Sequence, residues 1–203
     1  MTIKAEDVKR LRDMTGAGMM DCKKALQDAD GDLEKAKDLL RERGIAKAQK
    51  MAERSAKEGA IIAYLHQPNL DLPPKVGVML ELNSETDFVA KTEQFQKLGR
   101  EIAMHIAALA PSVVSRDDLP DEVVERERKL LRAQAEQEGK PENVVDKIVE
   151  GRLNAFFAQE VLLDQPFTRD EKKTIQELLD EAQAEMKEPI RVRRFARFRV
   201  GAE

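Results

Sequence analysis

Three stretches of β-type sequence interrupt an otherwise helical chain, and they limit the fold more than any other feature. Residues 60–66 and 76–83 are β-rich and are separated by a loop that contains proline. In the second stretch apolar residues occupy every other position, which is typical of a strand with one buried face. The alternating apolar positions are Val76, Val78, Leu80 and Leu82. We therefore expect these two stretches to be strands of one small sheet.

The third stretch, residues 190–200, predicts a strand with an apolar face and a basic face. The apolar face would carry Ile190, Val192, Ala196, Phe198 and Val200, and the basic face Arg191, Arg193, Arg197 and Arg199. We expect this strand to pair with the two earlier ones. Its arginines are interpreted as a solvated face or as partners of acidic helix surface, because charge runs are usually solvated.

Helical periodicity fills the rest of the chain. Residues 5–44 predict three short helices, with Gly16 ending the first and Gly44 the third. Residues 45–58 lack Gly and Pro and predict a polar linker that is helical or partly ordered. Longer helices are predicted near 95–109, 119–138, 142–164 and 170–187.

These patterns together predict an α+β protein with two domains. We expect a three-helix domain at residues 1–50 and a core domain at residues 51–203. In the core domain, a small three-stranded antiparallel sheet packs with helices.

Charge and composition disfavour several classes of function. The net charge of −4 disfavours non-specific nucleic-acid binding, which needs an excess of cationic side chains. Cys22 is the single cysteine, so no intrachain disulfide forms, and a reducing, cytoplasmic location is expected. The segment 1–7 lacks the apolar region of a signal peptide. Apolar stretches fall short of the roughly 20 residues that cross a bilayer, so no membrane partner is expected.

No pattern of catalysis is present in the sequence. It has no phosphate-binding glycine loop, nucleophile elbow or HExxH metal pattern, so we expect no catalytic residue, metal or cofactor. His105 lies beside the apolar stripe of its helix and is interpreted as a buried, hydrogen-bonded core histidine. His66 ends a strand before a loop, where a contact role is as plausible as none.

The corner at residues 84–91 joins an expected strand to an expected helix and places Phe88 directly after Asp87. In one interpretation, Thr86 or Asp87 caps the helix and Phe88 folds down as a buried hydrophobic staple. In the other, Phe88 is an exposed aromatic wedge that marks a partner pocket. The residues alone leave both interpretations open.

Met19 and Met20 stand at the entrance of the second expected helix. Both cannot point into a three-helix core, so we expect one to be internal and the other to be available for contact, since Met adapts well to partner surfaces. The alternative is that both are partly buried packing residues.

Several motifs resemble those of one known family. Residues 11–26 and 85–90 resemble two specific signature motifs of elongation factor Ts. Residues 103–108, 150–152 and 165–167 also match the family's pattern, in the family's order. The likeness covers essentially the whole chain.

The resemblance implies a non-enzymatic guanine nucleotide exchange factor that speeds GDP release from the GTPase elongation factor Tu. It implies that residues 1–50 form a ubiquitin-associated-like domain. The loop of Thr86, Asp87, Phe88 and Val89 would act on the partner's G domain. In the family, the Phe of this motif pushes between helices near the nucleotide and disturbs magnesium coordination, so that role falls on Phe88.

The resemblance also implies further contacts with the G domain. The N-terminal motif places Arg12, Met19 and Met20 in the interface. His66 lies in a segment that resembles part of the long family form, where it would help to perturb the phosphate-binding loop. His105, inside the motif at 103–108, is a further candidate contact.

The long family form has two related core subdomains, whereas only one fits between Gly59 and Glu203. Short members pair, so a homodimer is expected. Some short members carry a cysteine in the last strand that links the dimer, but Ala196 stands in that neighbourhood, so the dimer would be non-covalent.

Two rival functions are an adaptor without exchange activity and an RNA-binding protein that uses the terminal arginines. The second is disfavoured by the lack of interleaved exposed aromatics, and no direct nucleic-acid partner is expected.

Overall fold

The computed structural model describes residues 3–15, 17, 19–52, 54–67, 69, 71–139 and 141–201, and for residues 44–52 only the backbone is described. The expected helix stop at Gly16 lies outside these residues. Contacts divide the chain into two units, Met1–Ser55 and Ala56–Glu203.

The first unit consists of α1 (Ala5–Thr15), α2 (Met19–Asp28) and α3 (Leu33–Ala52). Asp32 begins α3, because its Oδ1 accepts the N–H groups of Glu34 and Lys35 at 3.0 and 3.1 Å. The small core contains Val8, Leu11, Cys22, Ala25, Leu26, Ala29 and Ala36.

The expected end of the third helix at Gly44 is wrong. The helix α3 continues through Gly44 to Ala52, within the segment interpreted as a linker. One glycine in a helix costs only about 1 kcal/mol relative to alanine, and the residues on both sides are good helix formers. The expected domain boundary at residue 50 therefore falls inside a helix.

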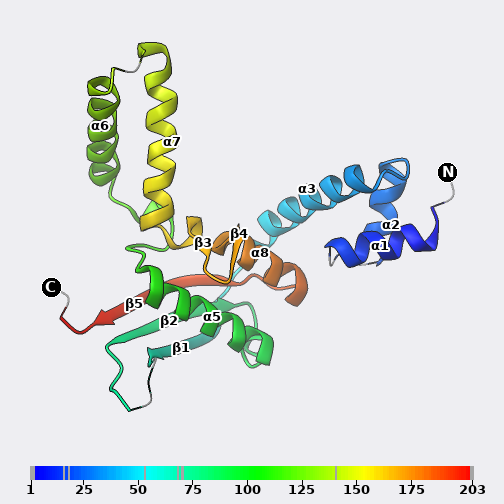
Figure 1. Ribbon diagram of the computed structural model, residues 1–203. Helices are drawn as coiled ribbons and strands as arrows, with labels where there is room; N and C mark the ends of the chain where they lie inside the picture. Colours follow the sequence, from blue (N-terminus) through cyan, green and yellow to red (C-terminus); the bar gives the residue numbers. More distant parts are fainter. Residues whose placement is uncertain are drawn as a thin grey trace. The chain divides into compact units, whose positions relative to one another are not determined.

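The second unit contains the expected three-stranded sheet. Its strands are β1 (Glu58–His66), β2 (Val76–Ser84) and β5 (Arg191–Arg199), in the order β1-β2-β5, and both pairs are antiparallel. Helix α5 (Glu93–Leu109) packs against β1 and β2 on one face of the sheet (Figure 1). The core between them includes Ile62, Leu80, Leu82, Phe95, Ile102 and Ile106.

The alternation expected for the last strand holds only for its first residues. A register shift pairs Leu82 with Val192 but Glu81 with Arg194, which leaves Arg193 as an extra residue in a β-bulge. The bulge exchanges the two faces of β5 beyond it. Phe195 therefore packs on the core, while Phe198 is 67% exposed. The prediction that Ala196, Phe198 and Val200 share the buried face is wrong for this reason.

Helices α6 (Asp121–Gln137) and α7 (Glu142–Glu160) run side by side as an antiparallel pair (Figure 1). They share a separate apolar cluster, which contains Leu119, Leu131, Ala135, Val145, Val149, Leu153, Phe157 and Val161. The second helix was expected to run to residue 164. It ends at Glu160 because Val161 is extended and bridges to Val113, and a 3-10 turn, Leu162–Asp164, follows.

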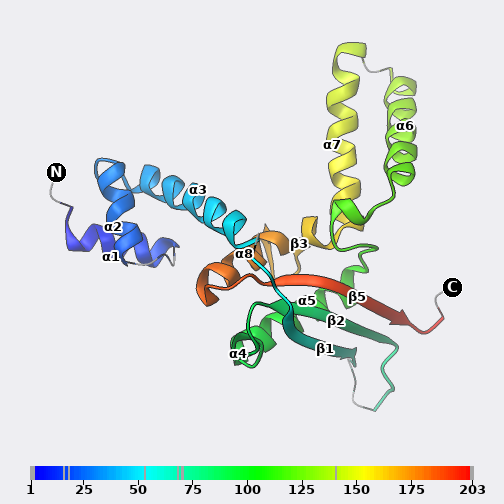
Figure 2. The ribbon, with the colours of Figure 1, turned by 180° about the vertical axis from the view of Figure 1, so that it is seen from behind.

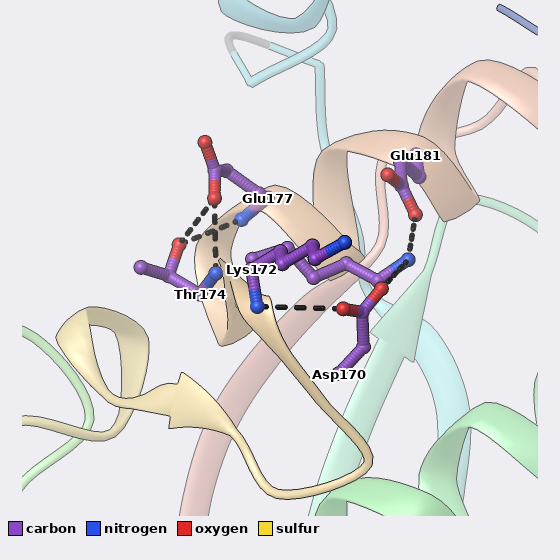
Figure 3. A network of polar contacts seen from close by, with 6 residues as sticks. Asp170, Lys172, Thr174, Glu177 and Glu181 are labelled. Carbon is purple, nitrogen blue, oxygen red and sulfur yellow. Dashed lines mark hydrogen bonds and ion pairs between the residues drawn. The ribbon is translucent and has the colours of Figure 1, made fainter. Parts of the chain in front are cut away.

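A short hairpin of β3 (Pro166–Phe167) and β4 (Asp170–Thr174) precedes α8 (Ile175–Met186). The expected helix at 170–187 therefore begins five residues too early. Thr174 and Glu177 form a capping box: Glu177 N–H donates to Thr174 Oγ1 at 3.2 Å, and Thr174 N–H donates to Glu177 Oε2 at 2.9 Å (Figure 3). This box sets the first turn of α8. Lys173 also pairs with Asp170 and Glu181 at this junction.

Within the part of the chain that the structure describes, no helix combines the length and the apolarity that a membrane crossing requires.

Candidate functional site

The candidate site is the corner between β2 and α5, where the short helix α4 (Asp87–Ala90) is inserted (Figure 2). Thr86 is extended, with φ −120° and ψ 153°, and it is the N-cap of α4. Its Oγ1 accepts the N–H of Val89 at 3.4 Å, so the expectation that Thr86 or Asp87 caps a helix here is met by Thr86.

Packing and hydrogen bonds on its inner side fix the corner to the core. Ala90 is buried, and Val89 packs against the main apolar cluster. Gln96 Nε2 donates to the carbonyl oxygen of Ala90 at 2.8 Å, and Thr92 Oγ1 donates to that of Val89 at 2.8 Å. A helix of four residues is unstable alone, so these contacts stabilise it.

Phe88 points away from this anchored side and is 80% exposed. The interpretation of Phe88 as a buried staple is therefore wrong, because Val89 and Ala90 occupy the inward positions of α4. An exposed aromatic ring on an anchored turn is a common anchor of protein interfaces.

Asp87 lies directly beside Phe88 and pairs with Lys91 one turn later. The hydrogen bond from Lys91 Nζ is the main cause that lowers the pKa of Asp87 below its ordinary value. Both side chains are largely exposed, so the ion pair adds little to the stability of the fold. It places charged groups on the surface next to Phe88.

The first unit presents its own candidate contact residues. Arg12 is exposed, and Met19 and Met20 are 55% and 74% exposed. The expectation that one of the two methionines is internal is wrong, because Cys22, Ala25 and Leu26 fill the inward face of α2. Met14, which was not singled out from the sequence, is also exposed, and its place within the motif at 11–26 was the available signal.

His66 is exposed at the end of β1, where its Nδ1 lies 3.0 Å from the hydroxyl of Tyr64. His66 therefore remains available to a partner. His66 lies at one end of β1 and Glu58 at the other. Glu58 pairs with Ser84 beside the corner, so His66 lies at the end of the strand that is away from the corner.

His105 is not available to a partner, so its place among the candidate contacts is wrong. Its exposed fraction is 0%. Its Nε2 lies 2.9 Å from Gln165 Oε1, and the N–H of Thr168 donates to its Nδ1 at 3.3 Å. Gln165 Nε2 donates to the Gln159 carbonyl at 2.7 Å, which fixes the amide orientation. These partners select the neutral Nε2–H tautomer, and burial lowers the pKa of His105.

Arg194 and Arg197 of the terminal strand form hydrogen bonds within the chain. Arg194 Nε donates to Glu81 Oε2 at 2.7 Å across the sheet. Arg197 donates to the carbonyl oxygen of Ala107 near the end of α5, at 3.2 and 3.0 Å. The partners are a strand carboxylate and a helix carbonyl rather than the acidic helix surface that was expected, and these contacts within the chain disfavour RNA binding.

The described residues contain no group of three or more His, Cys, Asp or Glu side chains placed to hold a metal ion.

Comparison with known proteins places the chain in a family. The family model described as elongation factor TS matches residues 40–202. The chain is 53% identical over 199 residues to elongation factor Ts of Thermosipho melanesiensis, covering 98% of this chain and 99% of that protein. It is 53% identical over 198 residues to elongation factor Ts of Frankia alni, covering 98% of this chain and 97% of that protein. The α+β fold agrees with this assignment. The chain belongs to the elongation factor Ts family.

Proposed function

We propose that this protein is a guanine nucleotide exchange factor that binds elongation factor Tu in its GDP-bound form and promotes release of GDP, so that GTP can rebind. Family membership supports the partner, and one observation supports the mechanism: Phe88 is 80% exposed on a corner that Val89 and Ala90 anchor to the core. A factor of this kind breaks no covalent bond. It therefore needs no catalytic residue.

Exchange follows from differential binding. Suppose that the exchange factor binds the nucleotide-free GTPase more tightly than the GDP-bound GTPase. Linkage then requires that the exchange factor weakens the affinity of the GTPase for GDP by the same ratio. A ~10⁴-fold weakening of nucleotide affinity corresponds to about 5.5 kcal/mol. One inserted aromatic anchor with a supporting interface is sufficient for an effect of that size.

The loop of Thr86, Asp87, Phe88 and Val89 would perform the displacement. In this proposal Phe88 inserts between helices of the G domain, and Asp87 approaches beside it. Magnesium bridges protein ligands and the phosphates, so moving those ligands removes much of the nucleotide affinity. Because Val89 and Ala90 already pack on the core, little conformational entropy is lost when Phe88 enters its pocket.

The first unit would supply a second contact with the same G domain. Arg12, Met19 and Met20 are the proposed contact residues, and their exposure supports this. His66 is proposed to act toward the phosphate-binding loop. We further propose that the first unit, Met1–Ser55, is a ubiquitin-associated-like domain and that the second, Ala56–Glu203, is a core domain that dimerises, with both working in the cytoplasm.

The outer face of the sheet supports the proposed non-covalent homodimer. Beyond the β-bulge, cross-strand register aligns Leu65, Gly77 and Phe198 in one row and Ala63, Met79 and Ala196 in the next. Among the larger apolar side chains exposed on this side are Ile61, Leu65, Met79 and Phe198. An apolar patch of this kind on a two-sided sheet favours association, and a second copy presents a matching patch.

Release of labelled GDP tests the exchange function. Elongation factor Tu is loaded with fluorescent GDP and mixed in a stopped-flow instrument with excess unlabelled GDP, with and without this protein. We expect the release rate to rise with the concentration of the protein and then to saturate. An adaptor without exchange activity would bind the complex and leave the release rate unchanged, which would refute the proposal.

A further inference from the structure

The N-cap of α4 is held by a residue that lies far away in the sequence. Thr86 donates its backbone N–H to Glu188 Oε2 at 3.0 Å and its hydroxyl to Glu188 Oε1 at 2.7 Å. The two residues are 102 positions apart. Both oxygens of one carboxylate are therefore directed at the residue that begins the helix carrying Phe88. Hydrogen bonds to an ionised acceptor are among the stronger ones in proteins.

The sequence of α4 explains why a distant carboxylate is needed. In a capping box, a Glu or Gln three residues after the N-cap accepts the N-cap N–H. The start of α8 has this arrangement, with Glu177 three residues after Thr174 (Figure 3). In α4 the equivalent position is Val89, whose side chain has no hydrogen-bond acceptor and packs on the core instead. Glu188 supplies the missing acceptor from another part of the chain.

The position of Glu188 is itself fixed on both sides. Lys187 adopts the left-handed conformation, with φ 59°, and its N–H donates to the carbonyl oxygen of Gln183 at 2.9 Å. Ile190 is buried, and its N–H donates to Gln183 Oε1 at 3.4 Å. The carboxylate therefore projects from a short link between α8 and β5 whose two ends are both tied to the core.

We infer that Glu188 is a positioning residue of the exchange site: its carboxylate holds Thr86 so that α4 presents Phe88 outward in one fixed direction. The inference rests on the proposed exchange function, but it makes a separate statement about the mobility of residue 88. Without the carboxylate, the N–H and hydroxyl of Thr86 lose their acceptor, and the first turn of α4 has fewer contacts that fix its direction.

The test compares Glu188→Ala and Glu188→Gln with a matched control, Glu185→Ala. Glu185 is exposed on α8, three positions before Glu188. At saturating concentration of the factor, Glu188→Ala is expected to lower the stimulated GDP release rate about tenfold, which corresponds to ~1.4 kcal/mol. Glu188→Gln keeps one acceptor oxygen, so a smaller loss is expected. The control is expected to match the wild type.

A second measurement distinguishes positioning from a general loss of stability. The chain contains no tryptophan, so Phe88→Trp introduces a single reporter. Time-resolved fluorescence anisotropy of Trp at 88 is expected to show a larger fast, local component when combined with Glu188→Ala than when combined with Glu185→Ala. Circular dichroism of the same samples checks that the fold is retained. If Glu188→Ala does not fold, Glu188→Gln carries both measurements.

The outcomes separate this inference from the proposed function. If the wild type accelerates GDP release and both Glu188 variants do so equally well, with unchanged anisotropy decay, Glu188 is not a positioning residue, although the exchange function stands. If the wild type itself fails to accelerate release, the exchange function falls, and the anisotropy comparison still decides whether Glu188 fixes the direction of residue 88.

Discussion

An exposed phenylalanine lowers solubility, and Phe88 makes little contribution to the packing of its own chain. It is therefore the residue best suited to a functional test. We expect Phe88→Ala to lower the stimulated GDP release rate by tenfold or more, because removal of an aromatic anchor typically costs about 2 kcal/mol of binding. The thermal midpoint should stay nearly unchanged, since the ring is 80% exposed. Stopped-flow release with labelled GDP measures the first quantity and circular dichroism the second.

A matched control for Phe88 exists on another element of the same unit. Leu130, on α6, is also an exposed large apolar residue, with an exposed fraction of 52%. Leu130→Ala should leave GDP release at the wild-type rate. Equal losses in both variants would mean that the effect of Phe88→Ala is not specific to the corner.

His105 predicts a pH dependence of stability. Burial lowers its pKa in the folded state, so below the ordinary histidine pKa of about 6.5 the unfolded chain takes up a proton that the folded chain does not. The free energy of unfolding should therefore fall as the pH drops below about 6.5, by at most ~1.4 kcal/mol per pH unit from this one group. Urea unfolding at pH 7.5 and pH 5.5 measures the change.

Carboxylates also titrate toward the lower pH, so His105→Gln is the comparison that isolates the histidine. This variant should be less stable than the wild type at pH 7.5, because the hydrogen bonds with Gln165 and Thr168 are disturbed. Its loss of stability between the two pH values should be smaller. Parallel losses in the two proteins would show that His105 does not cause the pH dependence.

These two residues show which site properties can be predicted from sequence. The buried state of His105 follows from its place beside a helical apolar stripe, which is local information. The direction of Phe88 does not follow, because four residues of helix give no usable periodicity. That direction depends on the chain path after β2 and on Glu188, which no local pattern connects to Thr86.

Among the elements, α5 and β1 approach each other closely at Gly99, and this predicts a contrast between two glycines. A Cβ at Gly99 would lie 2.6 Å from Ile62 Cγ1, in the packed core. Gly99→Ala should therefore destabilise the fold by about 1–3 kcal/mol through overpacking. Gly151, within α7, would place its Cβ in open space, so Gly151→Ala should stabilise by about 0.5–1 kcal/mol. Thermal unfolding of both variants measures the pair, and a stabilising Gly99→Ala would contradict the close approach.

Element types were predictable, but several of their ends were not. The strand β1 follows from its β-rich composition and β2 from alternation, and the helices α5 to α7 follow from periodicity. The bulge at Arg193 depends on pairing between β2 and β5, which a single strand does not reveal. The hairpin of β3 and β4 is too short and too polar for alternation to detect. The capping pair of Thr174 and Glu177 was a readable signal for the start of α8 and was missed.

At the scale of the whole molecule, the bulge in β5 decides what the sheet offers to another chain. It turns Ala196 and Phe198 to the outer face, where Ala63 and Ala196 flank Met79 on the central strand. Met79→Asp would place a charge in the middle of this patch. In a dimer formed through the patch, that charge would be buried without a partner, so we expect the variant to be monomeric.

Sedimentation equilibrium measures the outcome across a range of concentrations. The wild type should fit a dimer and Met79→Asp a monomer, whereas Leu130→Asp, on the exposed side of α6, should remain dimeric. Because Met79 is exposed within one chain, the secondary structure of Met79→Asp should be retained. If two copies are required to supply both halves of the exchange surface, monomeric Met79→Asp should also stimulate GDP release from elongation factor Tu less than the wild type does at equal chain concentration. A wild type that sediments as a monomer would refute the dimer and leave the Phe88 corner to act alone.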